Sequence, residues 1–176
     1  MYPISLFYYW LPTDAYVGVD KNYIVVAVVA AFFILEAVRL KTKFKMPLMR
    51  DYEEKRIGAY ALGSLGIAIG LLFFPLPVTA VAVCGMAWVD PICSTTKKGG
   101  GYPIVPALVY VDLAILIFLA ANYEPMNALL YGIVGGVVAI AAEKPNIKHI
   151  DDDLIMTLAP MLVLGALTQY LGGLLP

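Results

Sequence analysis

Residues that form disulfides or bind soft metals are scarce in this chain. Its 176 residues include two cysteines and one histidine. Cys84 and Cys93 lie at different depths of one predicted helix, too far apart for a disulfide, and are expected to be small core residues. His149 is expected to be a solvated loop residue, with a general base as the alternative. The P-loop pattern Gly-x4-Gly-Lys-Ser/Thr is also absent, which excludes that mode of nucleotide binding.

Charged residues are also few, at 14% of the chain, while 61% of the residues are hydrophobic. The mean hydropathy of +0.83 is too high for a soluble domain of this length. The apolar runs have about the 20 residues that a helix needs to cross a bilayer. The sequence therefore predicts an all-α, polytopic membrane bundle forming a single domain, residues 1–176. Six spans are expected, at about 20–40, 57–75, 76–94, 104–121, 125–142 and 154–175.

The N-terminal segment 1–19 lacks both a basic start and a small-residue cleavage pattern, so a cleaved signal peptide is not expected. Its aromatic residues are instead typical of an interfacial anchor.

The basic residues lie on one side of these predicted spans. Eleven of the 12 Lys and Arg residues fall in the stretches 39–56, 97–98 and 144–148, and nine of the 13 acidic residues lie in or next to the same stretches. By the positive-inside rule, these loops face the cytoplasm and both termini face outside. The sequence thus predicts a multi-pass protein of the cell membrane with a cytoplasmic active face. The net charge of −1 indicates no particular partner, and no nucleic-acid partner is predicted.

Two motifs with small residues predict close helix packing. They are Gly66-x-x-x-Gly70 and Gly132-x-x-x-Gly136, which allow two helix backbones to approach. Packing within the subunit is the first interpretation, and a homodimer through these faces is the alternative.

Charged pairs mark the ends of the first two predicted spans. Glu36 and Arg39 are spaced i, i+3 and share a helix face, as an interfacial ion pair or as part of a functional site. Arg50 can reach Glu53 and Glu54, and these acids suit the start of the second helix.

Asp90 ends the third apolar run and precedes a polar segment, residues 94–101. A flexible loop between two spans is one interpretation of this segment. A metal–nucleotide site is the other, because glycine backbones can approach phosphates, Lys97 and Lys98 can neutralise them, and an Asp can bind Mg²⁺.

Further acids flank the predicted fifth and sixth spans. Glu143 ends the fifth span, and Asp151, Asp152 and Asp153 open the sixth. The helix dipole favours acids there, but three adjacent carboxylates repel one another, and Mg²⁺ would relieve this repulsion. Asp112, at the middle of the fourth span, is expected to hydrogen-bond to another helix, with proton transport as the alternative.

In this order, the motifs resemble the CTP-dependent polyprenol kinase family, which includes dolichol kinase, phytol kinase and the CTP-dependent diacylglycerol kinase. The resemblance covers roughly residues 34–165. Its elements are Glu36-x-x-Arg39, Arg50-x-x-Glu53 followed by Gly58, an apolar helix ending at Asp90, Glu143, and Asp151-Asp152-Asp153-Leu154 followed by Pro160. The chain differs from the family at Val89-Asp90-Pro91, where Gly-Asp is usual, and at 97–101, where the Lys-Ser-x-Glu-Gly-Ser motif is missing.

The resemblance implies an integral-membrane lipid kinase that transfers the γ-phosphate of CTP or ATP to a prenol, dolichol-type or diacylglycerol hydroxyl. It implies Mg²⁺ bound by Asp90, Asp151, Asp152 and Asp153, and catalytic roles for Glu53, Asp90 and Asp152. The implied phosphate-binding residues are Arg39, Arg50, Lys97, Lys98, Gly99 and Gly100, with Glu36, Glu54 and Glu143 in support. The alternatives are a membrane cytidylyltransferase that makes a CDP-lipid and a small transporter that uses Asp112.

Overall fold

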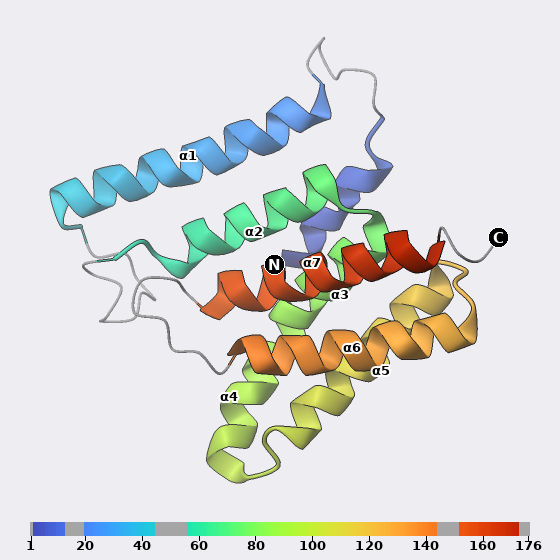
Figure 1. Ribbon diagram of the computed structural model, residues 1–176. Coiled ribbons are helices and arrows are strands. Elements are labelled where there is room, and N and C mark those ends of the chain that lie inside the picture. Colours follow the sequence, from blue (N-terminus) through green and yellow to red (C-terminus); the bar gives the residue numbers. More distant parts are fainter. Residues whose placement is uncertain (1, 13–19, 45–55, 144–151, 173–176) are drawn as a thin grey trace.

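The computed structural model describes residues 2–12, 20–44, 56–143 and 152–172, and these residues fold into helices without any strand (Figure 1). The all-α prediction is confirmed. The elements are η1 (Tyr2–Trp10, a 3₁₀ helix), α1 (Lys21–Thr42), α2 (Ala59–Phe73), α3 (Leu76–Cys84), η3 (Gly85–Val89, a π-helical segment), α4 (Asp90–Gly99), α5 (Ile104–Ala120), α6 (Pro125–Glu143) and α7 (Asp152–Gly172).

Within the described residues, four helices are long and apolar enough to cross a membrane. They are Lys21–Thr42, Leu76–Gly99, Pro125–Glu143 and Leu154–Leu171. The apolar helices α2 and α5 are shorter, with 15 and 17 residues, against about 20 for an untilted span. The chain is therefore a membrane protein by the length and composition of its helices.

The helices run between two ends of the bundle. At one end, which we call the polar end, α1 and α6 finish, α2 and α7 begin, and α4 leads into α5 (left and bottom in Figure 1). At the opposite end lie the start of α1 and the turns that join α2 to α3 and α5 to α6. Charged residues lie at the helix ends that meet here: Arg39 is in the last turn of α1, Lys97 is in the last turn of α4, and Glu143 ends α6.

Both glycine motifs pack inside the subunit. A Cβ atom on Gly132 would lie 2.8 Å from Ile115 and 3.0 Å from the carbonyl oxygen of Val111, both on α5. A Cβ atom on Gly70 would lie 2.6 Å from Met161 on α7. Neighbouring helices of the same subunit thus cover these faces, as the first interpretation expects, and a homodimer through them stays an untested alternative.

Helix η1 closes the opposite end of the bundle. The hydroxyl of Tyr9 lies 2.7 Å from the carbonyl oxygen of Phe74 and 2.8 Å from Oγ1 of Thr79, so it contacts the end of α2 and the start of α3. Phe7 and Trp10 remain exposed on the same helix. Their exposure suits an aromatic anchor at a membrane interface.

Replacing Gly132 with Ala is expected to destabilise the α5–α6 pair by about 1–3 kcal/mol, because the added methyl group overpacks the contact. The Gly99→Ala variant is the matched control, since a Cβ atom on Gly99 would have no heavy atom within 4 Å. Thermal unfolding in detergent should show a lower midpoint for Gly132→Ala and an equal or higher midpoint for Gly99→Ala. Equal loss in both variants would contradict the packing described here.

Candidate functional site

The helix that carries Asp90 changes its winding immediately before that residue. Residues Leu76–Gly99 form one continuous rod, in which the π-helical segment η3 separates α3 from α4. Pro91 follows Asp90 and lacks the N–H that would continue regular α-helical hydrogen bonding. Single π-helical turns of this kind are frequent at functional sites. Asp90 itself is half-buried.

The expected flexible loop after Asp90 is wrong over most of its length, because residues 94–99 continue α4. The hydroxyls of Thr95 and Thr96 donate to the carbonyl oxygens of Pro91 and Ile92, at 2.9 and 2.7 Å. Such bonds to the preceding turn let hydroxyl residues fit within a helix. The backbone turns away only at Gly100 and Gly101, whose φ values are 86° and 96°. Lys97 and Lys98 therefore lie in the last helical turn, where the helix dipole favours positive charge.

Glu143 joins three elements at the polar end. Its Oε1 accepts a hydrogen bond from Lys97 at the end of α4, and its Oε2 accepts one, at 2.7 Å, from the Tyr102 hydroxyl ahead of α5. The ammonium of Lys97 also lies 5.2 Å from the centre of the Tyr102 ring, a distance typical of a cation–π contact. The Glu143 side chain is 4% exposed and that of Lys97 is 48% exposed. Lys97 is thus anchored at the carboxylate yet accessible from outside.

Burial, followed by the hydrogen bond to Glu143 and its negative charge, raises the pKa of Tyr102 to about 12. The phenol therefore remains protonated at neutral pH. The Tyr102 hydroxyl can therefore donate its hydrogen bond to Glu143 and hold that carboxylate in place.

Asp90 shares a face of α4 with this junction. Asp90, Cys93 and Lys97 are spaced i, i+3 and i+7, which places them on one side of a helix. Cys93 on this face is fully buried. It is thus the small core residue that the sequence predicts.

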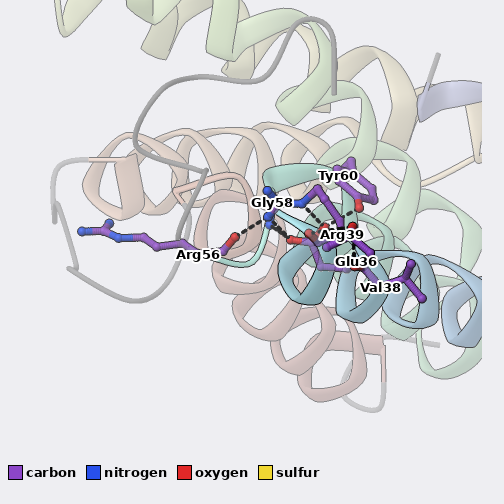
Figure 2. Close-up of polar contacts among 7 residues, drawn as sticks. Glu36, Val38, Arg39, Arg56, Gly58 and Tyr60 are labelled. Carbon is purple, nitrogen blue, oxygen red and sulfur yellow. Dashed lines mark hydrogen bonds and ion pairs between the residues drawn. The ribbon is translucent and has the colours of Figure 1, made fainter. Parts of the chain in front are cut away.

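A second polar cluster joins α1 to α2 (Figure 2). The carboxylate of Glu36 accepts from Nη2 and Nε of Arg39 at 2.6 and 2.8 Å, and from the backbone N–H of Gly58 at 2.6 Å. The Tyr60 hydroxyl donates to the same carboxylate. Arg39 also donates to the carbonyl oxygen of Arg56, at 2.6 Å. At 2% and 3% exposed, Glu36 and Arg39 form a buried ion pair with each partner satisfied by additional hydrogen bonds.

This cluster fixes the position of Arg39. The guanidinium is turned toward α2, and it donates hydrogen bonds to Glu36 and to the Arg56 backbone. Contact between Arg39 and a phosphate stays a prediction.

An apolar groove of about 340 Å³ separates α1 from its neighbours. It lies between η1, α1 and α2, and its wall includes Tyr8, Val28, Phe32, Ile67 and Leu71. The sequence did not predict this groove, because helices that are apolar on all sides show no periodicity that marks a gap between two of them.

The groove exists because α1 is attached at its two ends. At the polar end Glu36 and Arg39 hold α1 against α2. At the opposite end the Tyr8 hydroxyl donates to Asn22, and the Lys21 ammonium lies 4.6 Å from the centre of the Tyr8 ring. The apolar stretch between the attachments forms one wall of the groove.

Several predicted site residues lie outside the described residues: Arg50, Glu53, Glu54, His149 and Asp151, together with the side chains of Asp152 and Asp153. In the described part of the chain, no group of three His, Cys, Asp or Glu residues is placed to hold a metal. Mg²⁺ is usually held by only one or two carboxylates together with water and phosphate oxygens. Asp90 supplies one carboxylate, and α7 begins at Asp152 at the same end of the bundle. Asp90 is thus the one predicted Mg²⁺ ligand whose side chain is among the described residues, and the binding of Mg²⁺ stays a prediction.

Within the described part of the chain, Asp112 makes no hydrogen bond to another helix, contrary to expectation. It lies in α5 and is exposed on the outside of the bundle. Its neighbour Val111 instead faces α6, against Gly132 and Gly136. Asp112 therefore points away from the interior through which a transported ion or solute would pass.

Comparison with known proteins gives no match, whether to a protein-family model, a curated protein or a solved structure. The function of the chain is therefore argued from its motifs and its geometry.

Replacing Glu36 with Ala is expected to lower the free energy of unfolding by about 3–5 kcal/mol, because it leaves the Arg39 charge buried without its partner. Tyr60→Phe removes a single hydrogen bond from the same carboxylate and should cost about 1 kcal/mol. Denaturant titration in mixed micelles, followed by tryptophan fluorescence, measures both variants.

The double variant Glu36→Leu with Arg39→Leu is the control, since it removes both charges together. It should be more stable than Glu36→Ala. If the single and double variants lost the same stability, the ion pair would not be the cause.

Proposed function

We propose that the protein is an integral-membrane lipid kinase that transfers the γ-phosphate of CTP or ATP to the hydroxyl of a prenol, a dolichol-type lipid or a diacylglycerol. One observation carries the proposal. Helix α4, which carries Asp90 and Lys97, lies toward the same end of an apolar bundle as the end of α6 at Glu143 and the first turn of α7. Such an end is where a water-soluble nucleotide can meet a lipid hydroxyl held at the membrane interface.

The proposed topology follows from the same arrangement. Each of the six apolar rods spans the membrane, the polar end faces the cytoplasm, and both chain termini face outside. The short helices α2 and α5 cross where the bilayer is locally thinner. The basic stretches 39–56, 97–98 and 144–148 then all lie on the cytoplasmic side.

The geometry of α4 suits the binding of phosphates. Lys97 is held at Glu143 while half of its side chain stays exposed, so its charge is positioned before a ligand arrives. Cβ atoms on Gly99 and Gly100 would meet no heavy atom within 4 Å, and the backbone there is open to approach. Together with Lys98 and Arg50, these groups would neutralise the charge of a triphosphate.

In the proposed reaction, the oxygen of the lipid hydroxyl attacks the γ-phosphorus. The bond from that phosphorus to the β–γ bridging oxygen breaks, CDP or ADP leaves, and the hydroxyl proton passes to Glu53 or Asp152. Asp90, Asp151, Asp152 and Asp153 would hold Mg²⁺, which when bound supplies neutralisation of the phosphate charge. Positioning and charge neutralisation are the main demands of phosphoryl transfer, and a preformed junction such as Lys97–Glu143 serves both.

The groove between η1, α1 and α2 supports a lipid as the second substrate. Its volume of about 340 Å³ lies within the range of small-molecule pockets, about 300–1,000 Å³. Its lining is almost wholly apolar, as an isoprenoid or acyl chain requires. Toward the polar end the groove reaches Phe32, whose ring packs edge-on against Tyr60 of the Glu36 cluster. A tail in the groove would therefore direct its head group toward the polar end.

The kinase proposal is tested by transfer of label from γ-³²P-CTP or γ-³²P-ATP to geranylgeraniol, dolichol or diacylglycerol, with purified protein in lipid nanodiscs and Mg²⁺. The variant Asp90→Asn is expected to lower the rate by about 10²–10³-fold, as loss of a group that stabilises transition-state charge does. The matched control is Glu124→Gln, an exposed acid at the opposite end, which should keep the full rate.

Absence of transfer to all three lipids would contradict the kinase proposal. Incorporation of label from α-³²P-CTP, with release of pyrophosphate, would instead show a cytidylyltransferase.

Filling the groove should weaken lipid binding and leave the chemical step intact. Val28→Trp places a large ring in the groove, whereas Val26→Trp adds the same ring to α1 at a position outside the groove lining. The two valines are similarly exposed, at 49% and 53%. We expect Val28→Trp to raise the KM for the lipid at least about 10-fold with little change in kcat, because it removes binding common to the ground and transition states. Equal KM values for the two variants would rule out the groove as the binding site of the lipid tail.

A further inference from the structure

Helix α1 buries its charged residues and leaves its apolar residues uncovered. Of its residues from Lys21 to Thr42, the two that are buried in the bundle are Glu36 and Arg39. Every apolar side chain of α1 is exposed or only half-buried. A helix that packs firmly into a bundle buries its apolar stripe instead. The contacts that hold α1 in place are therefore the polar ones near its two ends.

One face of α1 carries both the groove and the buried pair. Val25, Val28 and Phe32 stand along this face and line the groove opposite α2. Glu36 and Arg39 follow Phe32 at spacings of four and three residues, which continues the same row. Helix α1 thus packs against α2 at the buried pair and stands away from it along the groove.

The attachment at the polar end, which we call the hinge, is buried. The carboxylate of Glu36 is 2% exposed, and it accepts hydrogen bonds from Arg39, the Gly58 backbone and the Tyr60 hydroxyl. Separating α1 from α2 here would remove Gly58 and Tyr60 from a buried charge, which is strongly unfavourable. The hinge therefore fixes this end of α1.

The attachment at the opposite end, which we call the latch, lies at the surface. There the Tyr8 hydroxyl of η1 donates to Asn22, and the Lys21 ammonium donates to the carbonyl oxygen of Leu11 at 3.2 Å. Asn22 and Leu11 are exposed, so water can replace these bonds when they break, and each contributes little. The latch is therefore the weaker of the two attachments.

The apolar middle of α1 adds little to the latch in a bilayer. Helix α1 is among the four helices that are long and apolar enough to cross a membrane. Lipid tails are as apolar as valine or phenylalanine, so a bilayer provides no hydrophobic force between two helices. When α1 moves away from α2, contacts along the groove are exchanged for contacts with lipid.

We propose that α1 is a gate that turns about the hinge and opens at the latch, and so admits a lipid tail sideways into the groove. This proposal rests on the lipid substrate of the proposed function. The hinge lies at the polar end, where the lipid hydroxyl has to remain. Only the apolar tail then moves between α1 and α2, and the polar head group never enters the hydrocarbon interior. Return of the latch encloses the tail for the reaction.

Distances between pairs of spin labels in lipid nanodiscs test the motion without any nucleotide. The latch pair is Val26→Cys with Phe73→Cys, and the hinge pair is Val38→Cys with Ile57→Cys. All four positions are exposed, whereas both native cysteines are buried. The latch pair should show a second, longer distance, and the hinge pair should show one distance.

A variant that weakens only the latch makes this test specific. Asn22→Ala removes the acceptor of the Tyr8 hydroxyl, and Asn22 does not line the groove. Loss of one hydrogen bond should raise the fraction of the longer distance about two- to five-fold. The matched control is Thr42→Ala, because the Thr42 hydroxyl donates to the Val38 carbonyl oxygen within α1, at 2.9 Å. This control should leave both pairs unchanged.

Lipid entry is measured as the association rate of dansyl-labelled geranylgeraniol, followed by energy transfer from tryptophan. Asn22→Ala should raise this rate by the same factor as the longer distance, and Thr42→Ala should not change it. Equal lengthening at both pairs, or an unchanged rate in Asn22→Ala, would overturn the gate.

The gate and the kinase can fail separately. Phosphate transfer to a lipid, with distances and association rate unaffected by Asn22→Ala, would overturn the gate and support the kinase. Opening and faster association, without transfer to any of the three lipids, would overturn the kinase and support the gate.

Discussion

The hydrocarbon interior of a bilayer supplies neither water nor counter-charge, and the placement of ionisable residues in this chain follows from that constraint. Most of these residues lie beyond the apolar runs, and the exceptions have specific partners. Glu36 lies within α1 but receives hydrogen bonds from Arg39, Gly58 and Tyr60. Glu143, at the last turn of α6, receives them from Lys97 and Tyr102. Because Gly58, Tyr60, Lys97 and Tyr102 come from other elements than the carboxylates they bind, each buried carboxylate also fastens one helix to the next. Asp112 is the described acid that this rule leaves unexplained within one subunit.

The same constraint connects the fold to the proposed function. Polar attachments can form only near the ends of α1, so its middle packs loosely and leaves an apolar groove beside α2 and η1. At the polar end, the Glu143 junction sets the position of Lys97, two turns along α4 from Asp90, before any ligand binds. A hydrocarbon groove and a preorganised charged end within one small bundle suit a reaction between a lipid and a phosphorylated, water-soluble substrate. We infer the kinase reaction from this combination and from the order of the motifs.

The sequence predicted the helices well because their length and apolarity are set by the bilayer. It also predicted that Gly132 and Gly136 pack within the subunit, since small residues repeating every fourth position mark close packing.

The sequence-based prediction failed where the outcome depends on which way a uniformly apolar helix faces. The outward direction of Asp112 and the groove beside α1 are of this kind. The contact between Lys97 and Glu143, 46 residues apart, depends on tertiary packing. The loop expected from residue 94 was wrong, since residues 94–99 continue α4 and the Thr95 and Thr96 hydroxyls bond to carbonyl oxygens of that helix. The roles of the acids that precede the second and sixth predicted spans remain predictions, because Glu53 and Asp151 lie outside the described residues.

The central claim is that the polar end of the bundle is a cytoplasmic nucleotide site, and cysteine labelling in sealed vesicles of known orientation tests it most directly. Ser94→Cys introduces a thiol at an exposed position on α4 near Asp90, and Glu124→Cys introduces one in the exposed turn between α5 and α6. An impermeant maleimide should label position 94 only from the cytoplasmic side, and Mg²⁺–CTP or Mg²⁺–ATP should protect it. Position 124 should be labelled only from the other side, with or without nucleotide. Labelling of both positions from the same side, or of position 94 at an unchanged rate with saturating nucleotide, would contradict the account.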